Sequence, residues 1–487
     1  MTRSPTWPIR RERMLDLLIR GGHVVTPAGA GTWDVGIQGE HIVVVAAPGV
    51  LAEAAQVLDV AGKLVIPGGI DPHIHAQWPI PSPGGGPPVL SGGPAQVSRA
   101  ALFGGTTTLI DFAPWSIGET LQQSIERRER DWLGRCYSDY AYHVMLVGTV
   151  PPDVLDQIPE VIQAGFPSIK LFTTDITPSR RGRRVRMGDM WEVFQRTARH
   201  GGLVAVHAED DDLVMHMYDR LAREGRTGFE HMAEVHSTLS EDLAFRRVLR
   251  LAEHVPGAAV YMVHVSAAEG VAAIAECRAK GLPVYGETLH HYASYTSEAY
   301  KRPHGQIYHT YPSLKGERDC TALWAGMASG SIGSIATDGI CTPLQVKLQG
   351  DRIDDVTGGN AGVEPRIGIM YSESVGRRGF SLERFVDLTS ANAARVFGLY
   401  PRKGAIAVGS DADITIIDPA VDRILGPDDL HETDYSPWAG WHITGWPVTT
   451  ILRGKVAVDR GQLQVDTRYG RRINRQISPA ILNGPAC

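Results

Sequence analysis

The chain has 487 residues, of which 43% are hydrophobic and 21% are charged, so it can bury a large core and has room for more than one domain. Its formal net charge of −6 provides no basic surface for nucleic acid. No apolar run reaches the roughly 18 residues that span a membrane. The five cysteines, an odd number without a Cys-x-x-Cys pair, predict reduced thiols in a cytoplasmic protein.

Short apolar, β-branched runs near both ends of the chain predict strands. In the N-terminal part these runs are residues 17–19, 35–37 and 42–45. Near the other end they are residues 414–417 and the residues on either side of the turn at Arg453-Gly454.

A longer series of apolar runs occupies the middle of the chain. Most of them are continuous rather than alternating, as in parallel strands that are covered on both faces. Segments with helical character separate the runs, and this alternation is the pattern of a (β/α)8 barrel. The eight predicted strands are residues 64–70, 106–112, 141–147, 168–173, 203–206, 259–263, 282–285 and 331–336. The predicted helices include residues 119–130, 190–200, 241–253, 267–280 and 317–327.

Polar residues lie at or near the ends of several of these strands. The first strand leads into Asp71-Pro72-His73-Ile74-His75, where two histidines at i and i+2 point to the same face of an extended segment. Because active-site groups of such barrels gather at the carboxyl ends of the strands, we expect these residues to converge at one mouth. A metal would satisfy four histidines and an aspartate at once. The six residues are His73, His75, Lys170, His207, His264 and Asp338.

Each of these residues also has an ordinary structural interpretation. A single histidine at a strand end is commonly a core or rim residue. Lys170 could extend its ammonium to solvent, and Asp338 before Gly339 could form a simple turn. Chance rarely places six such residues together at or near the ends of the predicted barrel strands, so the pattern favours a shared metal site.

These motifs resemble the amidohydrolase superfamily, in its binuclear subtype with a carboxylated lysine. Within the superfamily, the chain is most similar to the dihydropyrimidinase and hydantoinase family of cyclic amidohydrolases. The resemblance runs from about Leu15 to Leu463. The stretches that carry it are residues 65–73, 104–107, 206–209, 263–266 and 362–366.

The resemblance implies a binuclear centre and a hydrolytic mechanism. Lys170 would take up CO₂ to form a bridging carbamate. A hydroxide between the metals would attack the amide carbonyl, and Asp338 would accept its proton and pass it to the leaving nitrogen. Zinc is the expected metal, although such a site also accepts cobalt, manganese or nickel. The implied ligands are His73, His75, Lys170 and Asp338 for one ion, and Lys170, His207 and His264 for the other.

The residues expected to hold the substrate depart from the family pattern. The family tyrosine five residues after the lysine is Asp175 here, and the expected asparagine is Gly358. The family sequence Ser-Pro-Pro-Leu-Arg has become Tyr311-Pro312-Ser313-Leu314-Lys315, and Asp-His-Cys has become Asp338-Gly339-Ile340-Cys341. The hydrolytic machinery therefore matches the family, and the pocket does not.

Other residues are candidates for substrate binding. We expect His290, His291, Tyr311 and Asn360 to bind the substrate, with loop surface as the alternative for the two histidines. Asp175 would repel a developing oxyanion if it pointed inward, so it should face away or pair with a nearby arginine. The nearby arginines are Arg180, Arg181, Arg183 and Arg184, which we interpret as a solvated loop rather than a nucleic-acid patch.

The resemblance also implies a domain organisation. Residues 15–63 and 400–465 would form a composite β-sandwich domain beside a barrel of residues 64–399. The C-terminal tail, residues 466–487, would be a subunit contact or a disordered end. Relatives are commonly dimers or tetramers, so a homo-oligomer is expected.

The predicted activity is metal-dependent hydrolysis of a C–N amide bond that opens a cyclic imide, ureide or lactam. Hydrolysis of open-chain amides, carbamates or ureas is the alternative, because the altered pocket governs specificity. A non-catalytic scaffold is less favoured, because all six ligand positions are intact. Glu209 near His207 would suit a deaminase, but Lys170 in its strand argues for the carboxylated-lysine type.

Overall fold

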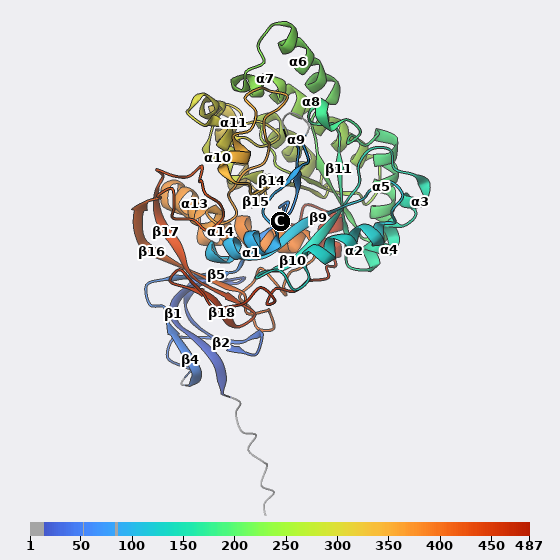
Figure 1. The fold of residues 1–487 in the computed structure, drawn as a ribbon. Helices are drawn as coiled ribbons and strands as arrows, with labels where there is room; N and C mark the ends of the chain where they lie inside the picture. The colour runs from blue at the N-terminus through green and yellow to red at the C-terminus, as the bar shows by residue number, and fades with distance from the viewer. Residues whose placement is uncertain (1–13, 52, 83–85) are drawn as a thin grey trace, which may run out of the picture.

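The computed structural model describes residues 14–51, 53–82 and 86–487. It contains a parallel barrel surrounded by helices and a mixed sheet built from segments near both ends of the chain. In Figure 1 the barrel lies above and the mixed sheet below. The predicted fold, a (β/α)8 barrel with a small β-sandwich domain, is confirmed.

Eight parallel strands form the barrel, and they follow one another around it in chain order. Every residue in them is buried except Pro114, as expected of strands that are covered on both faces. The strands are β6 (Gly69–Asp71), β9 (Thr106–Pro114), β10 (Asp139–Met145), β11 (Ser168–Phe172), β12 (Leu203–His207), β13 (Ala259–Met262), β14 (Val284–Leu289) and β15 (Ser334–Ala336).

Contacts just beyond β6 and β15 close the barrel at its carboxyl end. Ile74 and Gly339 form an isolated parallel bridge, and the His75 amide donates to the Gly339 carbonyl at 2.8 Å. The buried carboxylate of Asp71 accepts a hydrogen bond of 2.6 Å from the Thr337 hydroxyl. The residues that follow the first and last strands are therefore held next to each other.

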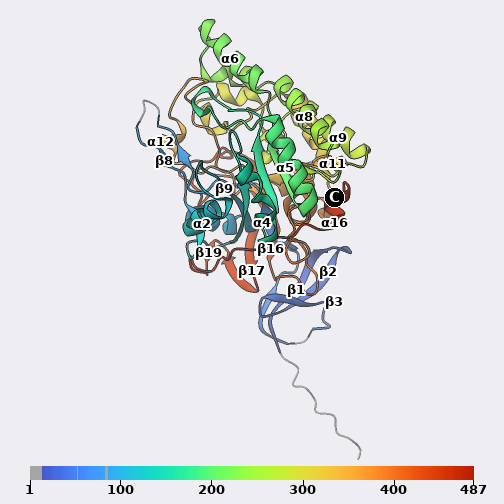
Figure 2. The ribbon, with the colours of Figure 1, turned by 90° about the vertical axis from the view of Figure 1, so that its right-hand side faces the viewer.

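Helices cover the outside of the barrel, and side chains satisfy free amides at several of their first turns. Thr120 and Gln123 form a capping box at α2, and Ser237 accepts from the Ser240 amide at α8. Helices α5, α8, α9 and α11 lie side by side along one flank (Figure 2). The longer helices are α1 (Pro94–Phe103), α2 (Leu121–Trp132), α5 (Met187–His200), α6 (Asp211–Arg223), α8 (Thr238–Glu253), α9 (Ala268–Ala279) and α11 (Glu317–Ser329). The shorter ones are α3 (Pro152–Leu155), α4 (Ile158–Gln163), α7 (Met232–Val235), α10 (His290–Ser294), α12 (Leu344–Lys347), α13 (Arg366–Met370), α14 (Leu382–Val386), α15 (Asn392–Val396) and α16 (Pro479–Asn483).

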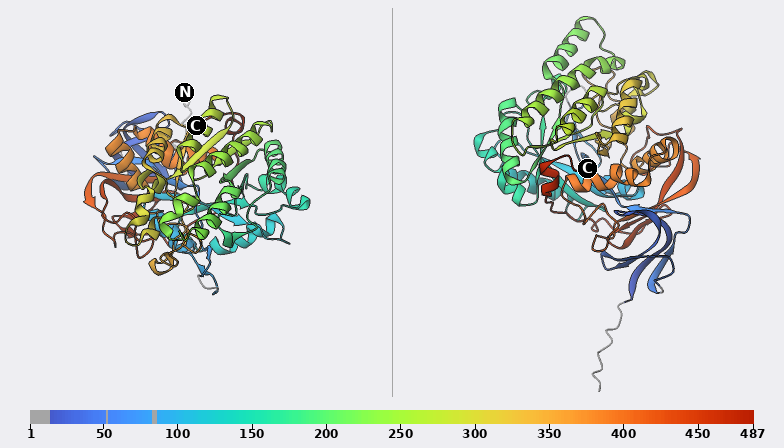
Figure 3. Two further views of the ribbon diagram at one scale, coloured as in Figure 1. Left: turned by 90° about the horizontal axis from the view of Figure 1, so that it is seen from above. Right: turned by 180° about the vertical axis from the view of Figure 1, so that it is seen from behind.

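The mixed sheet joins N-terminal and C-terminal strands around its own apolar core, which includes Leu17, Ile37 and Ile414. Seen from behind, it lies at one end of the molecule (Figure 3). Its strands are β1 (Leu15–Thr26), β2 (Gly29–Gln38), β3 (His41–Ala46), β4 (Ala54–Asp59), β5 (Leu64–Pro67), β16 (Ile414–Ile424), β17 (His442–Leu452), β18 (Lys455–Asp459) and β19 (Gln462–Leu463).

The run 64–70, which we predicted as one barrel strand, is two strands in different sheets. Its first part, β5, pairs with β1 and β16 in the mixed sheet, and only β6 enters the barrel. The chain changes sheets at Gly68, where a Cβ atom would lie 2.3 Å from Oγ1 of Thr107. Both strands are buried and apolar, so composition alone could not separate them.

The C-terminal tail packs against the barrel of its own chain. Ile473 and Ile481 are buried in an apolar cluster with Tyr261 and Tyr285 of the barrel strands. The Ile473 amide donates to the Tyr140 carbonyl at 2.8 Å. The tail is thus ordered in this structure, and the alternative of a disordered end is wrong. Its role as a subunit contact stays a prediction.

Within the described residues, no helix is long and apolar enough to cross a bilayer. All five cysteines lie in the described part of the chain and are free thiols. The reduced state of the thiols in the cell and the cellular compartment stay predictions.

A buried charge cluster ties the barrel to the mixed sheet. Lys403 Nζ lies 2.7 Å from Asp139 at the start of β10, and 2.6 and 3.1 Å from Asp413 and Asp411, just before β16. Burial by itself would lower the pKa of Lys403, but the three carboxylates outweigh burial and raise it. Arg453 adds a second cation at Asp139. The junction therefore depends on charges that balance one another away from water.

We expect Lys403→Met to lower the free energy of unfolding by about 3 kcal/mol or more, because it leaves three buried carboxylates with too little positive charge. Urea or thermal unfolding followed by circular dichroism measures the change. Lys280→Met is the matched control, because its 3.1 Å contact with Glu253 is on the surface. Equal effects of the two substitutions would contradict the importance of the buried cluster.

Candidate metal centre and active site

The six predicted ligand residues line one cavity at the carboxyl end of the barrel. His73 and His75 lie just beyond β6, and Asp338 lies just beyond β15. Asp338 Oδ1 is 3.2 Å from His73 Nε2 and 3.1 Å from His75 Nε2. One ligand atom from each of the three residues lies within 4.8 Å of the others, so they could hold a single ion.

Two further histidines face each other at the ends of neighbouring strands. His207 is the last residue of β12, and His264 follows β13. His207 Nδ1 lies 2.9 Å from His264 Nε2, and both rings are buried. Imidazole nitrogens that approach each other in this way are well placed to bind a second cation.

Lys170 lies in the middle of β11 with its amine pointing into the same cavity. Nζ is buried and has no hydrogen-bond partner among the described residues. Burial lowers the pKa of Lys170 to about 7, although Asp338 and Glu287 act in the opposite direction. A buried amine without a hydrogen-bond partner is costly, so this lysine fits a site in which an added group supplies the missing partner.

Glu287 in β14 supports His73 and His264, and it was not predicted from the sequence. Its Oε1 lies 2.8 Å from His73 Nδ1 and accepts from the His264 amide at 3.1 Å. Burial disfavours the charged His73 ring, but Glu287 and Asp338 together outweigh burial and raise the pKa of His73. A carboxylate at Nδ1 also leaves Nε2 facing Asp338. The lone acidic residue within an apolar strand was the available sequence signal.

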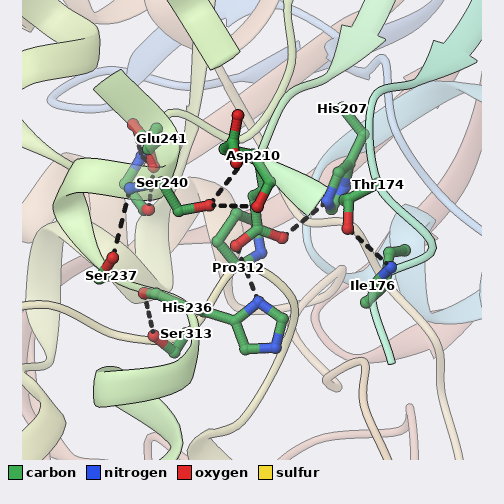
Figure 4. A network of polar contacts seen from close by, with 12 residues as sticks. Thr174, Ile176, His207, Asp210, His236, Ser237, Ser240, Glu241, Pro312 and Ser313 are labelled. Carbon is green, nitrogen blue, oxygen red and sulfur yellow. Dashed lines mark hydrogen bonds and ion pairs between the residues drawn. The ribbon is translucent and has the colours of Figure 1, made fainter. Parts of the chain in front are cut away.

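A second network supports His207 from the side away from the cavity. His207 Nε2 lies 2.9 Å from Glu209 Oε2, and Glu209 Oε1 lies 2.8 Å from His236 Nδ1. His236 Nε2 is 3.1 Å from the Tyr218 hydroxyl, and the Ser313 hydroxyl donates to the His236 carbonyl at 3.1 Å. Figure 4 shows His207, His236 and Ser313 in this network. Glu209 is therefore engaged with two histidines and does not line the cavity.

Two of the candidate ligands have a left-handed backbone conformation that residues other than glycine rarely adopt. The φ angle is 39° at His264 and 48° at Asp338. Each lies two residues beyond the end of a barrel strand, His264 after β13 and Asp338 after β15. Strained backbone at the residues that aim side chains into the cavity is typical of functional sites.

The predicted substrate-binding residues have different positions. Tyr311 lines the cavity with the candidate ligands, whereas His290, His291 and Asn360 do not. The two histidines are fully buried at the start of α10, where the His290 ring stacks on Trp438 with 4.9 Å between ring centroids. The alternative that they form loop surface is wrong. Asn360 is also buried, and its carbonyl accepts from the Ile340 amide at 3.0 Å.

Asp175, at the family tyrosine position, is turned toward the backbone of its own loop. Its Oδ1 accepts from the amides of Gly182, Arg183 and Arg184 at 3.1, 2.8 and 2.8 Å. Asp175 therefore faces away from the cavity, as expected, but it binds backbone amides rather than a guanidinium. The arginine loop is not simply solvated, because Arg180 and Arg183 line the cavity. Spacing alone could not show which arginines point inward.

Comparisons with known proteins agree with this geometry. The model of the amidohydrolase family matches residues 64–457. A D-hydantoinase from Geobacillus stearothermophilus is 33% identical over 96% of this chain and 98% of its own length. A D-hydantoinase from Streptomyces coelicolor is 34% identical, covering 91% of this chain and 94% of its own. The crystal structure of dihydropyrimidinase from Brevibacillus agri superposes with a TM-score of 0.88 at 32% identity, covering 94% of this chain and 98% of its own.

The family match spans most of the chain, the relatives align over nearly their full lengths, and the candidate ligands converge at the carboxyl end of the barrel. The chain belongs to the amidohydrolase family, in the group that includes the D-hydantoinases and dihydropyrimidinase.

Proposed function

We propose that this protein is a metal-dependent hydrolase that opens the ring of a cyclic imide, ureide or lactam by cleaving its C–N amide bond. The observation that carries the proposal is the convergence of His73, His75, Lys170, His207, His264 and Asp338 on one cavity. The D-hydantoinase relatives align over nearly the whole chain, which supports the same reaction class here.

We further propose that the cavity holds two divalent ions. His73, His75 and Asp338 would hold one ion, His207 and His264 the other, and a carboxylated Lys170 would bridge them. The orphaned amine of Lys170 supports this assignment, because addition of CO₂ with loss of a proton turns a buried amine into an anionic ligand. The nitrogen and oxygen donors suit zinc. Bound ions would supply Lewis acidity and lower the pKa of the attacking water.

Asp338 is the proposed proton carrier. Burial disfavours its charge, but His73 and His75 hold the pKa of the Asp338 carboxyl well below its usual range. The Thr310 hydroxyl donates to its Oδ2 at 3.1 Å. An ionised, oriented carboxylate at this point could accept a proton from water and return it to the leaving nitrogen.

The pocket differs from the family pattern at two positions that contact each other. A Cβ atom at Gly358 would lie 2.3 Å from Cε2 of Tyr311, so the tyrosine ring occupies space that any larger residue at 358 would need. The tyrosine in place of the family serine and the glycine in place of the family asparagine are therefore coupled. This change in shape makes open-chain amides, carbamates or ureas the second candidate substrates.

Assembly and location complete the proposal. We expect a homo-oligomer, a dimer or tetramer, in the cytoplasm, and light scattering on the purified protein tests the oligomeric state.

Lys170→Ala removes the proposed bridging ligand, so we expect loss of bound metal and a fall in ring-opening kcat/KM of about 10³-fold or more. The assay supplies zinc and bicarbonate and compares hydantoin, dihydrouracil, cyclic imides, and linear amides and carbamates. Mass spectrometry of the bound metals gives the stoichiometry. Lys280→Ala, on the surface, should match the wild type. Turnover of linear compounds alone would overturn the cyclic assignment.

Gly358→Ala should destabilise the protein by about 1–3 kcal/mol, because the new methyl group overlaps the Tyr311 ring. In the double variant with Tyr311→Ser the overlap is gone, so the two effects should be non-additive by about 1 kcal/mol or more. Chemical denaturation of the four proteins measures this coupling. Gly188→Ala is the matched control, because nothing lies within 4 Å of a Cβ atom there. Strict additivity would show that residues 311 and 358 are independent.

A further inference from the structure

Two arginines point into the active-site cavity from the loop that follows β11. Arg183 Cζ lies 5.1 Å from the centroid of the Phe172 ring, and Lys170 Nζ lies 5.3 Å from the same centroid. Arg180 Cζ lies 5.3 Å from the centroid of the Tyr311 ring. Both guanidinium groups are thus placed against residues that line the cavity of the candidate metal ligands.

These guanidinium groups differ from their neighbours in the same loop. Arg184 contacts Asp211 at 3.1 Å, and Arg186 contacts Asp189 at 3.0 Å. No carboxylate of the described residues lies within 4.0 Å of the guanidinium nitrogens of Arg180 or Arg183. Partly buried guanidinium groups without an anion are unfavourable, and the two also repel each other. The cavity therefore presents two cations that make no ion pair with any of the described residues.

Hydrogen bonds hold the backbone of the loop that carries Arg180 and Arg183 in place. Asp175 Oδ1 accepts hydrogen bonds from the backbone amides of residues 182–184, and the Asp175 carboxylate makes no ion pair within 4.0 Å with Arg180 or Arg183. The Asp175 amide donates to Asp211 at 2.8 Å, and the Arg183 carbonyl accepts from the Gly148 amide at 3.0 Å. Burial, and to a smaller degree Arg180, lowers the pKa of Arg183 to about 9, although Asp175 acts in the opposite direction, and Arg183 remains charged at neutral pH.

We propose that the substrate carries a carboxylate beside its amide ring, and that Arg180 and Arg183 bind this carboxylate. The inference rests on the proposed ring-opening function and names the substrate class for it. Guanidinium groups match the planar carboxylate and donate two parallel hydrogen bonds to it. The residue that replaces the family tyrosine, Asp175, acts as a positioning residue for the loop and not on the substrate.

The test compares 5-(carboxymethyl)hydantoin with its primary amide, which has nearly the same shape without the charge. The wild type should prefer the carboxylate in kcat/KM. In Arg183→Gln and Arg180→Gln the ratio of the two kcat/KM values should fall by about 30-fold or more, chiefly through KM for the carboxylate. Arg181→Gln removes an exposed charge in the same loop and should keep the wild-type ratio.

The positioning role of Asp175 has its own readout. Asp175→Ala should lose the carboxylate preference together with the loop geometry, whereas Asp175→Asn keeps an acceptor oxygen and should retain most of it. Circular dichroism confirms that each variant is folded.

Equal kcat/KM for the acid and the amide in the wild type would overturn the inference and leave ring opening intact. The same holds if the arginine variants lower both values together and leave the ratio unchanged. If neither compound is opened, calorimetric binding decides. Binding of the acid at least tenfold tighter than the amide, lost in Arg183→Gln, supports the carboxylate site, and equal binding overturns it. Failure of ring opening across the wider panel overturns the proposed function separately.

Discussion

Polar groups buried at the carboxyl end of the barrel constrain this structure, because each of them needs a hydrogen-bond partner or a bound ligand. Asp338 lies within hydrogen-bonding distance of two imidazoles, two other imidazoles face each other, and the Lys170 amine has no partner among the described residues. In an apolar surrounding such groups are costly unless they bind something or one another. The metal ions that the family implies would satisfy these groups, and on the proposed function the arrangement serves a reaction rather than the stability of the barrel.

Several contacts within the fold position these buried polar groups relative to one another. The contacts of Asp71 with Thr337 and of His75 with Gly339 bring the first and last strands together, so that His73, His75 and Asp338 meet. Glu287 and Glu209 then fix the rings of His73 and His207 from behind. Outer carboxylates of this kind orient ligands and set their tautomers, and they are as much a part of the site as the ligands.

The cavity walls beside the candidate ligands are held by two sets of contacts, at residues that the sequence analysis found to depart from the family pattern. Asp175 accepts hydrogen bonds from the backbone of the arginine loop, and Arg183 of this loop and Lys170 both lie near the Phe172 ring. Tyr311 fills the space that Gly358 leaves open. On the proposed function, the candidate ligands keep the family pattern, and the residues around them set the shape and charge of the pocket. Selectivity between related rings resides in such contacts, so the chemistry can persist while the substrate changes.

The amino-acid sequence by itself determined the alternation of strands and helices, the barrel, and the identity of the candidate ligands, because periodicity and strand-end position are local properties. Only the tertiary structure decided that residues 64–70 divide between two sheets, since both halves are equally apolar. It also decided that His290 and His291 pack against Trp438, that Glu287 and His236 support the candidate ligands, and that Arg180 and Arg183 turn inward. Which way a loop side chain points depends on contacts with residues far away in the chain, and no local pattern encodes those contacts.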